Sequence, residues 1–250
     1  MTNKRILVLN PNSSLHMTDV LDALIKKYSD QLPHGVHIET YTAPSGPPSI
    51  DNDDDALMST KAVMADLQFR FEEYDAYLVT CYSVHPLVGM LKARVSPRIH
   101  VTGIFEASIL TALSLLPLDS DLKFGIISTG TFWEKALTLG VDKLCGSENS
   151  NNKRLKGVET IGLNASDLHD TDAEEVKIKV QRATKRLVRD KDVRVICLGC
   201  ATMAGLYTTV AEALKEELGE KAQSVYIVDG VLAGLCQLET LIREVPAKSL

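Results

Sequence analysis

Two cysteines follow apolar segments that are typical of buried β-strands. Cys200 comes just after Val193–Leu198, a largely β-branched run of the kind found in parallel sheets covered on both faces. A helix is expected to open near Met203, which would place Cys200 at the carboxyl end of its strand and beside a helix N-terminus. That position binds ligands in open α/β sheets and favours a thiolate over a thiol. Cys200 is therefore a candidate reactive residue.

The second cysteine stands in the same sequence setting. Cys81 ends the apolar segment 76–80 and is followed by small or polar residues before the next helix. It precedes Cys200 by 119 residues, and Asn10, at the end of the first strand, precedes Thr129 by the same interval. A repeat of this length indicates two similar α/β halves, because solenoid repeats are far shorter. If the halves face each other, the two thiols can remove a proton from one face of a carbon and return one to the other.

The elements that must position these thiols alternate between strand and helix, which predicts a parallel-rich sheet in each half. The first half is expected to span 1–117 and the second 118–223, with the segment from about 224–250 able to pack back onto the first. Segment 100–107 matches 226–233 at a larger offset, so the second half carries a small insertion. The predicted fold is α/β, with two Rossmann-like halves related by a pseudo-two-fold axis and an active-site cleft between them.

Polar turns accompany the cysteines at the same edge of each predicted sheet. Asn10 and Asn12 follow the first strand, and the turn 128–131 follows its counterpart. An Asn side chain offers a donor and an acceptor together, which matches an amide or ureide edge, although Asn-Pro can also simply form a turn. The hydroxyl residue two positions beyond each cysteine can contact a substrate or cap the next helix. The candidate substrate-binding residues are Asn10, Asn12, Ser83, Thr129, Gly130, Ala201 and Thr202.

The remaining cysteines indicate weaker alternatives. Cys197 and Cys200 form a C-x-x-C redox pattern, but Cys197 falls inside the strand and should point into the sheet packing. A zinc site needs about four clustered ligands, and neither a second C-x-x-C nor an H-x-x-x-H is present. We therefore expect neither a metal nor a cofactor. Cys145 and Cys236 are expected on helices, within the core.

Several other side chains near the turns have structural explanations. Tyr82, Val84 and His85 are expected to crowd the turn after Cys81. His85 can act as a proton shuttle, although a lone His before Pro is more often structural. Glu106 and Asp229 begin predicted helices, where acidic residues need no further role.

Composition limits the class of partner. The chain of 250 residues is 45% hydrophobic and 24% charged, which is ordinary for a soluble globular protein. A net charge of −6 argues against a nucleic-acid surface, which needs clustered Lys and Arg. A secretory signal or membrane segment is not expected, because no apolar span of sufficient length occurs. Five cysteines do not indicate a disulfide framework. We expect a cytoplasmic protein with a small-molecule substrate, and the sequence allows a homo-oligomer.

Four motifs together resemble those of the hydantoin and allantoin racemase family, within the wider cofactor-independent aspartate/glutamate racemase group. They are Leu9–Ser14, Gly46–Asp51, Thr80–Ser83 and Leu198–Met203, and the resemblance covers nearly the whole chain in order. It implies two α/β halves with a cleft between them and a two-base mechanism that uses Cys81 and Cys200. It further implies substrate contacts from Asn12, Ser83, Thr129 and Gly130.

The expected reaction is inversion of a carbon next to a carbonyl, with one cysteine as thiolate base and the other as thiol acid. A free thiol with a pKa of about 8.5 is mostly protonated at neutral pH, so helix N-termini are expected to favour the thiolate. The expected substrate is a cyclic ureide such as allantoin or a 5-substituted hydantoin. One alternative is an isomerase or decarboxylase of the same group that acts on a small dicarboxylic acid, although no Lys or Arg occurs in the turns. Another is a ligand-binding protein without turnover.

Overall fold

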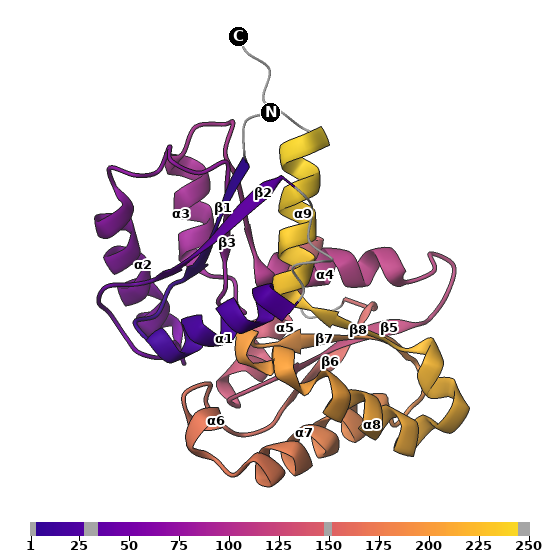
Figure 1. The fold of residues 1–250 in the computed structure, drawn as a ribbon. Helices are drawn as coiled ribbons and strands as arrows, with labels where there is room; N and C mark the ends of the chain where they lie inside the picture. Colours follow the sequence, from indigo (N-terminus) through magenta and orange to yellow (C-terminus); the bar gives the residue numbers. More distant parts are fainter. Residues whose placement is uncertain (1–3, 28–34, 148–151, 245–250) are drawn as a thin grey trace. The chain divides into compact units, whose positions relative to one another are not determined.

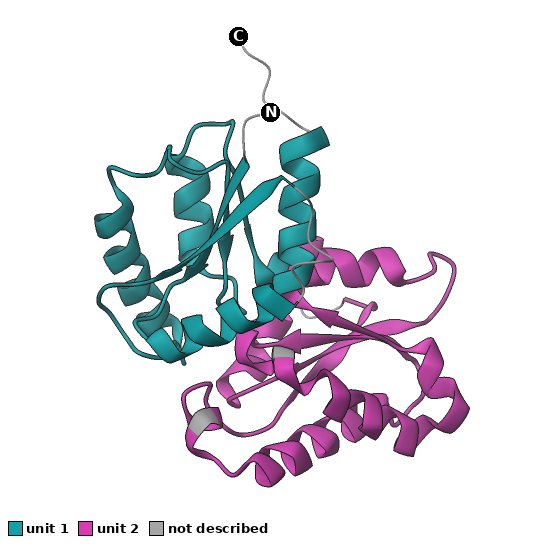
Figure 2. Ribbon diagram, in the orientation of Figure 1, with its two compact units in different colours: residues 1–107, 231–250 teal, residues 108–230 magenta. Residues whose placement is uncertain are grey.

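The computed structural model describes residues 4–27, 35–147 and 152–244. The chain forms two compact units, of which one comprises residues 1–107 with 231–250 and the other residues 108–230 (Figure 2). Each unit contains a four-stranded sheet in which every strand pair is parallel (Figure 1). The predicted α/β class and the two Rossmann-like halves are confirmed.

The sheet of the first unit has the strand order β2-β1-β3-β4. Its central strands are β1 (Lys4–Asn10) and β3 (Ala76–Val79), and β2 (Val36–Thr42) and β4 (His100–Gly103) flank them. The central strands are almost completely buried, as continuous apolar runs predict for strands covered on both faces. Their carboxyl ends lead into the Asn10 turn and the Cys81 turn.

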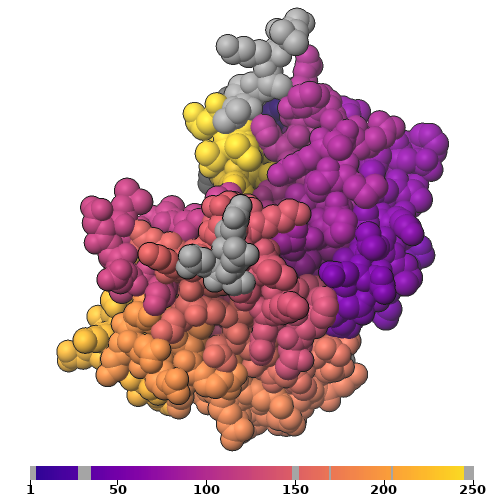
Figure 3. Space-filling view, turned by 180° about the vertical axis from the view of Figure 1, so that it is seen from behind, coloured from indigo at the N-terminus to yellow at the C-terminus, as the bar shows by residue number. Residues whose placement is uncertain are grey.

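Alternate residues of these strands pack on different helices. Leu7, Leu9, Tyr77 and Val79 belong to one buried cluster, which also contains apolar residues of α2 and α3. Leu78, on the other side of the sheet, fills the space beside Gly234. The region of α2 and α3 forms the purple surface of the space-filling view (Figure 3). The helices that connect these strands are α1 (Leu15–Lys27), α2 (Asp53–Leu67) and α3 (Pro86–Arg94).

The sheet of the second unit repeats this order as β6-β5-β7-β8. Its central strands are β5 (Lys123–Ser128) and β7 (Val193–Gly199), and β6 (Leu155–Thr160) and β8 (Tyr226–Asp229) lie at the edges. The two sheets therefore share one topology. The helical segments of this unit are α5 (Phe132–Cys145), α6 (Asp167–Asp170), α7 (Ala173–Val188), η2 (Ala201–Leu206), α8 (Tyr207–Leu218) and η3 (Gly219–Ser224).

The last helix of each half packs mainly in the unit that does not contain its preceding strand. Helix α4 (Ile104–Leu115) follows β4, but its residues from Ser108 onward belong to the second unit, where the Ser108 carbonyl oxygen lies 3.7 Å from Cys197 Sγ. Helix α9 (Gly230–Glu244) follows β8 and belongs almost entirely to the first unit. There Gln237 Oε1 accepts a hydrogen bond of 3.0 Å from Thr102 Oγ1.

This packing explains where the unit boundaries fall. The chain enters the second unit at residue 108 instead of the expected 118, because α4 packs on β7. It returns at residue 231 instead of about 224, because β8 pairs with β7. Within the described ranges, no helix is long and apolar enough to cross a membrane.

The cysteines on helices differ from expectation in one respect. Cys145 is half-buried, whereas Cys236 is exposed on α9, so its predicted place in the core is wrong. The apolar face of α9 carries Val231, Leu235 and Leu238, all buried, and position 236 falls outside that stripe. Cys197 is fully buried inside β7, as predicted.

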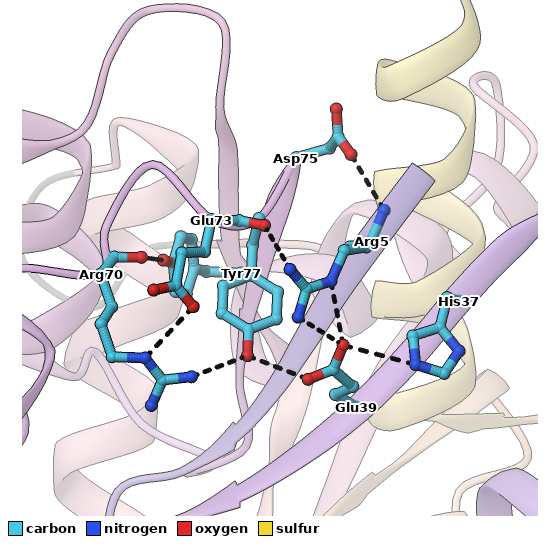
Figure 4. A network of polar contacts seen from close by, with 8 residues as sticks. Arg5, His37, Glu39, Arg70, Glu73, Asp75 and Tyr77 are labelled. Carbon is cyan, nitrogen blue, oxygen red and sulfur yellow. Dashed lines mark hydrogen bonds and ion pairs between the residues drawn. The ribbon is translucent and has the colours of Figure 1, made fainter. Parts of the chain in front are cut away.

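A polar network ties together the strands of the first unit away from the cysteine turn (Figure 4). Arg5 donates from Nε and Nη2 to Glu39 Oε1 at 3.0 and 2.7 Å, and the Tyr74 hydroxyl donates to Glu39 Oε2 at 3.0 Å. The hydrogen bond from Arg5 keeps the pKa of Glu39 below its usual range. Arg5 also donates its backbone N–H to Asp75, just before β3. These contacts hold β1, β2 and β3 together.

Candidate active site

The turn after β1 is built by its own asparagine side chains. Asn10 Nδ2 donates to Asn12 Oδ1 at 3.0 Å, to the Ser14 carbonyl oxygen at 3.1 Å and to Thr18 Oγ1 at 3.1 Å, and Asn10 Oδ1 accepts from the Asn12 N–H. Asn12 Oδ1 also accepts from the Ser14 N–H at 2.9 Å, and Asn12 Nδ2 lies 3.0 Å from Met17 Sδ. Both asparagines are buried. Their amides thus shape the turn, and substrate contacts from Asn10 and Asn12 stay predictions.

The Cys81 turn, residues 80–85, begins where β3 ends. Thr80 fixes its start, because both its N–H and its hydroxyl donate to the Leu9 carbonyl oxygen of β1. Cys81 is half-buried, and its Sγ lies 3.4 Å from Ser83 Oγ. The Ser83 N–H donates to the Cys81 carbonyl oxygen at 3.0 Å, which folds the turn back on itself. The hydroxyl of Ser83 therefore lies beside the sulfur and does not cap a helix.

The bulky residues Tyr82 and Val84 follow Cys81 and have different surroundings. The Tyr82 ring is buried and contacts the Phe105 ring edge-to-face, with centroids 5.5 Å apart. Val84 is 42% exposed. Aromatic packing thus holds Tyr82 in the core, and the expected crowding of the turn stays a prediction.

Both ring nitrogens of His85 make hydrogen bonds within the protein. Its Nδ1 accepts from the Leu87 N–H at 3.2 Å, and it is the N-cap of α3. Its Nε2 lies 3.2 Å from Ser59 Oγ, and since that hydroxyl donates to the Ala56 carbonyl oxygen, Nε2 carries the proton. Burial lowers the pKa of His85 to about 4. These contacts favour the structural interpretation of His85 over a proton-shuttle role.

This burial predicts acid sensitivity. The unfolded chain binds a proton at His85 below pH 6.5, whereas the native chain resists protonation to about pH 4. The contribution of neutral His85 to the free energy of unfolding should therefore be fully present above pH 6.5. The free energy of unfolding should fall by up to about 3 kcal/mol as the pH drops from 6.5 to 4. Urea titrations across this range should show a shallower fall for His85→Asn, in which Asn keeps a capping oxygen. Parallel pH profiles for the two proteins would contradict this assignment.

The Cys200 turn, residues 199–206, repeats the arrangement around Cys81. Cys200 is half-buried, and its Sγ lies 3.0 Å from Thr202 Oγ1. Ser128 Oγ, at the end of β5, donates to the Gly199 carbonyl oxygen at 2.9 Å. This bond joins the same two strand ends as the bond from Thr80 to Leu9, with donor and acceptor strands exchanged. Ala201 follows and is half-buried. Each unit thus presents a strand-end cysteine with a hydroxyl group beside its sulfur.

Neither cysteine lies at the N-terminus of an α-helix. Cys200 precedes the 3₁₀ segment η2, and α8 begins only at Tyr207, not near Met203 as expected. Helix α3 begins at Pro86, five residues beyond Cys81. Because the helix dipole acts within about the first turn, it is not the main influence on either thiol.

The turn after β5 corresponds to the Asn10 turn of the first unit. Thr129 is buried, and its carbonyl oxygen accepts from the Gly162 N–H at 3.1 Å. A Cβ at Gly130 would lie 2.8 Å from Asn164 Oδ1, so a side chain there would displace the end of the Asn164 side chain. Each unit therefore brings its polar turn and its cysteine turn to the carboxyl ends of neighbouring central strands.

Comparison with known families shows to which family the chain with these paired turns belongs. A model of the family described as Asp/Glu/Hydantoin racemase matches residues 6–238. The chain belongs to this racemase family. It is therefore related to isomerases, and the resemblance seen in its four motifs is confirmed at the level of the family.

Individual relatives of this racemase-family chain span nearly its whole length. It is 35% identical to the Schizosaccharomyces pombe protein C1F7.10, with 96% of this chain and 92% of that protein covered. It is 28% identical to a hydantoin racemase of Pseudomonas sp. strain NS671, over 95% and 86% of the two chains. The structure of allantoin racemase from Pseudomonas fluorescens aligns with a TM-score of 0.78 at 23% identity, covering 98% and 93%. The last comparison supports the shared fold.

The structure identifies a buried ionisable group, Glu106, that the sequence pattern had explained as an ordinary helix start. Glu106, in the first turn of α4, has a carboxyl oxygen that is buried and makes no hydrogen bond to any described residue. The only sequence signal was an acid early in a helix, which is common on helices of every function. Among the described residues, no group of three or more His, Cys, Asp or Glu is placed to hold a metal ion.

Proposed function

We propose that this protein is a cofactor-independent racemase that inverts the carbon next to a carbonyl in a cyclic ureide, either allantoin or a 5-substituted hydantoin. The observation that carries the proposal is the repeated turn: in each unit a half-buried cysteine follows a central strand and has a hydroxyl oxygen within 3.4 Å of its sulfur. Relatives named hydantoin racemase and a fold neighbour named allantoin racemase support the choice of substrate.

The mechanism assigns one proton transfer to each thiol. Cys81 or Cys200, as thiolate, removes the proton from the substrate carbon, and the other, as thiol, delivers a proton to the opposite face. The hydroxyls of Ser83 and Thr202 lie where they can donate to a thiolate and so favour it. The substrate carbonyl takes up the developing charge, with backbone N–H groups of the turns as donors, so the reaction needs no cofactor.

The remaining candidates have narrower roles in this proposal. Thr129, Gly130 and Ala201 line the turns and contact the substrate. Asn10 and Asn12 contact it from the turn that their own hydrogen bonds shape. Gly130 has no side chain, so its backbone can approach the ligand closely. The proposal requires both thiols to reach one carbon from opposite faces.

Isotope exchange tests this requirement. With a single enantiomer of a 5-substituted hydantoin in deuterated water, we expect early product to carry deuterium while unreacted substrate keeps its hydrogen. The reason is that the thiol which protonates the product has exchanged with solvent, and the thiolate which took the substrate proton serves the other face. NMR and polarimetry on the same samples measure both pools, with a blank without enzyme to subtract spontaneous exchange. Early product that retains hydrogen would show that one group serves both faces.

A further inference from the structure

The segment after β6, residues 161–166, runs alongside the turn that follows β5. The Ile161 N–H donates to the Ser128 carbonyl oxygen at 3.1 Å. The Gly162 N–H donates to the Thr129 carbonyl oxygen at 3.1 Å, so the pairing of β6 with β5 continues past the ends of both strands. Gly162 has a φ of 73°, which allows the chain to turn there. The segment is thereby held at the carboxyl end of β5.

The backbone of Asn164, within this segment, is fixed by the start of α6. The Asn164 N–H donates to Asp167 Oδ2 at 3.0 Å, and the Asp167 N–H donates back to the Asn164 carbonyl oxygen at 3.1 Å. The side chain of Asn164 takes no part in this pair. It is exposed and makes no hydrogen bond with any residue that the structure describes. Both polar atoms of its amide are therefore open to a ligand, on a backbone that is already held in place.

The amide of Asn164 reaches from its own segment to the end of β5. Its Oδ1 lies 2.8 Å from the point that a Cβ of Gly130 would occupy. Strand β5 pairs on its other side with β7, and Ser128 lies opposite Gly199 in that pairing. Neighbouring strands are about 5 Å apart, and Cys200 directly follows Gly199. The amide and the Cys200 turn thus lie at the same edge of one sheet, at neighbouring strand ends.

Asparagine amides also occur at the strand ends of the first unit, where they hold a turn together. Asn10 Nδ2 donates to three acceptors, of which one is Asn12 Oδ1, and that oxygen also accepts from a backbone N–H. The corresponding turn of the second unit, residues 128–131, contains no Asn. Asn164 approaches it from the neighbouring strand instead. The second unit therefore presents an amide whose donor and acceptor are both unused by the fold.

We propose that Asn164 is a specificity-determining residue that binds the imide edge of the substrate through its side-chain amide. The inference rests on the proposed racemase function and adds to it the group that recognises the ureide. A hydantoin ring carries an imide N–H between two carbonyl groups. Asn164 Oδ1 accepts from this N–H, and Nδ2 donates to a neighbouring carbonyl oxygen. A small dicarboxylic acid in its ionised form offers acceptors only and leaves the Asn164 oxygen without a donor.

A matched pair of substrates tests the inference. One is a 5-substituted hydantoin, and the other is the same compound with a methyl group on the imide nitrogen. The wild-type protein is expected to racemise the unmethylated compound with a kcat/KM at least about tenfold higher, because methylation removes the proton that Asn164 accepts. In Asn164→Ala this preference should fall to about twofold or less, since neither compound then has the amide as a partner. Polarimetry measures both rates.

Gln223→Ala is the control variant. Gln223 is exposed on η3, which precedes β8 and so lies at the opposite edge of the same sheet. Its amide, like that of Asn164, makes no hydrogen bond with a described residue. Gln223→Ala should keep the wild-type preference between the two substrates. Asn164→Ala keeps both backbone hydrogen bonds of residue 164, so circular dichroism of the two variants should match that of the wild type.

Calorimetric titration extends the test to variants whose turnover is too slow to measure. Racemic substrates undergo no net reaction, so the ratio of their Kd values reports the same preference. A preference that persists in Asn164→Ala, or a wild type that treats both compounds alike, would overturn the inference and leave the racemase function standing. Absence of racemisation of both the unmethylated hydantoin and allantoin by the wild type would overturn the proposed function, and the inference with it.

Discussion

Cys81→Ser and Cys200→Ser are each expected to reduce racemisation of a 5-substituted hydantoin by about a thousandfold. Proton transfer by a positioned side chain contributes roughly a hundredfold to ten-thousandfold to a rate, and a serine hydroxyl is far too weak an acid to replace a thiol in either role. Each cysteine is half-buried at the end of a central strand, and serine is nearly isosteric, so the fold should persist. Polarimetry from each enantiomer in turn measures the loss.

Two cysteines outside the turns are matched controls for this prediction. Cys145 is half-buried on α5 and Cys236 is exposed on α9, so Cys145→Ser and Cys236→Ser should keep activity close to that of the wild type. Circular dichroism of all four variants separates loss of chemistry from loss of fold. Full turnover in folded Cys81→Ser or Cys200→Ser would remove that residue from the mechanism.

Gly199→Ala is expected to lower the free energy of unfolding by about 1–3 kcal/mol and to abolish most activity. Gly199 ends β7, and a Cβ there would lie 2.8 Å from the Ile127 carbonyl oxygen and 2.9 Å from Ile126 Cγ2. The first of these atoms is backbone in the central strand β5, so it cannot rotate away. The strand end must move instead, and Cys200 is the next residue. Urea denaturation measures the first effect and polarimetry the second.

Gly89→Ala provides the opposite case. Gly89 is exposed on α3, and a Cβ there would meet no atom within 4 Å. Alanine should therefore stabilise the helix by about 0.5–1 kcal/mol and leave racemisation unchanged. If Gly199→Ala proved as stable and as active as Gly89→Ala, the prediction would be wrong. The end of β7 would then tolerate a Cβ close to the Ile127 carbonyl oxygen.

The elements and their order were predictable from sequence because they rest on local patterns. Buried parallel strands appear as short apolar runs, and the run before Cys200 predicted β7 almost to the residue. The repeat at a constant interval then predicted two sheets of one topology, and it put Cys81 and Cys200 at equivalent strand ends. These conclusions need only the spacing of residue types along the chain.

Other features depended on contacts between distant residues, which the sequence does not encode locally. The place of α4 and α9 was decided by packing against β7 and β3, so the unit boundaries moved to 107 and 230. The 3₁₀ segment η2 follows Cys200, so α8 begins only at Tyr207. The thiol of Cys200 is therefore not at the N-terminus of an α-helix, where the sequence had predicted it.

The polar residues around the site show the same limit most clearly. An Asn that could bind a ureide and an Asn that braces a turn look alike in sequence, and only the structure shows that Asn10 braces its turn through three hydrogen bonds. Glu106 looked like an ordinary helix start until its carboxyl was found filling the space at Gly103. Hydrophobic periodicity therefore predicted where the candidate site lies, whereas the hydrogen-bond partners and burial of each polar side chain exist only in three dimensions.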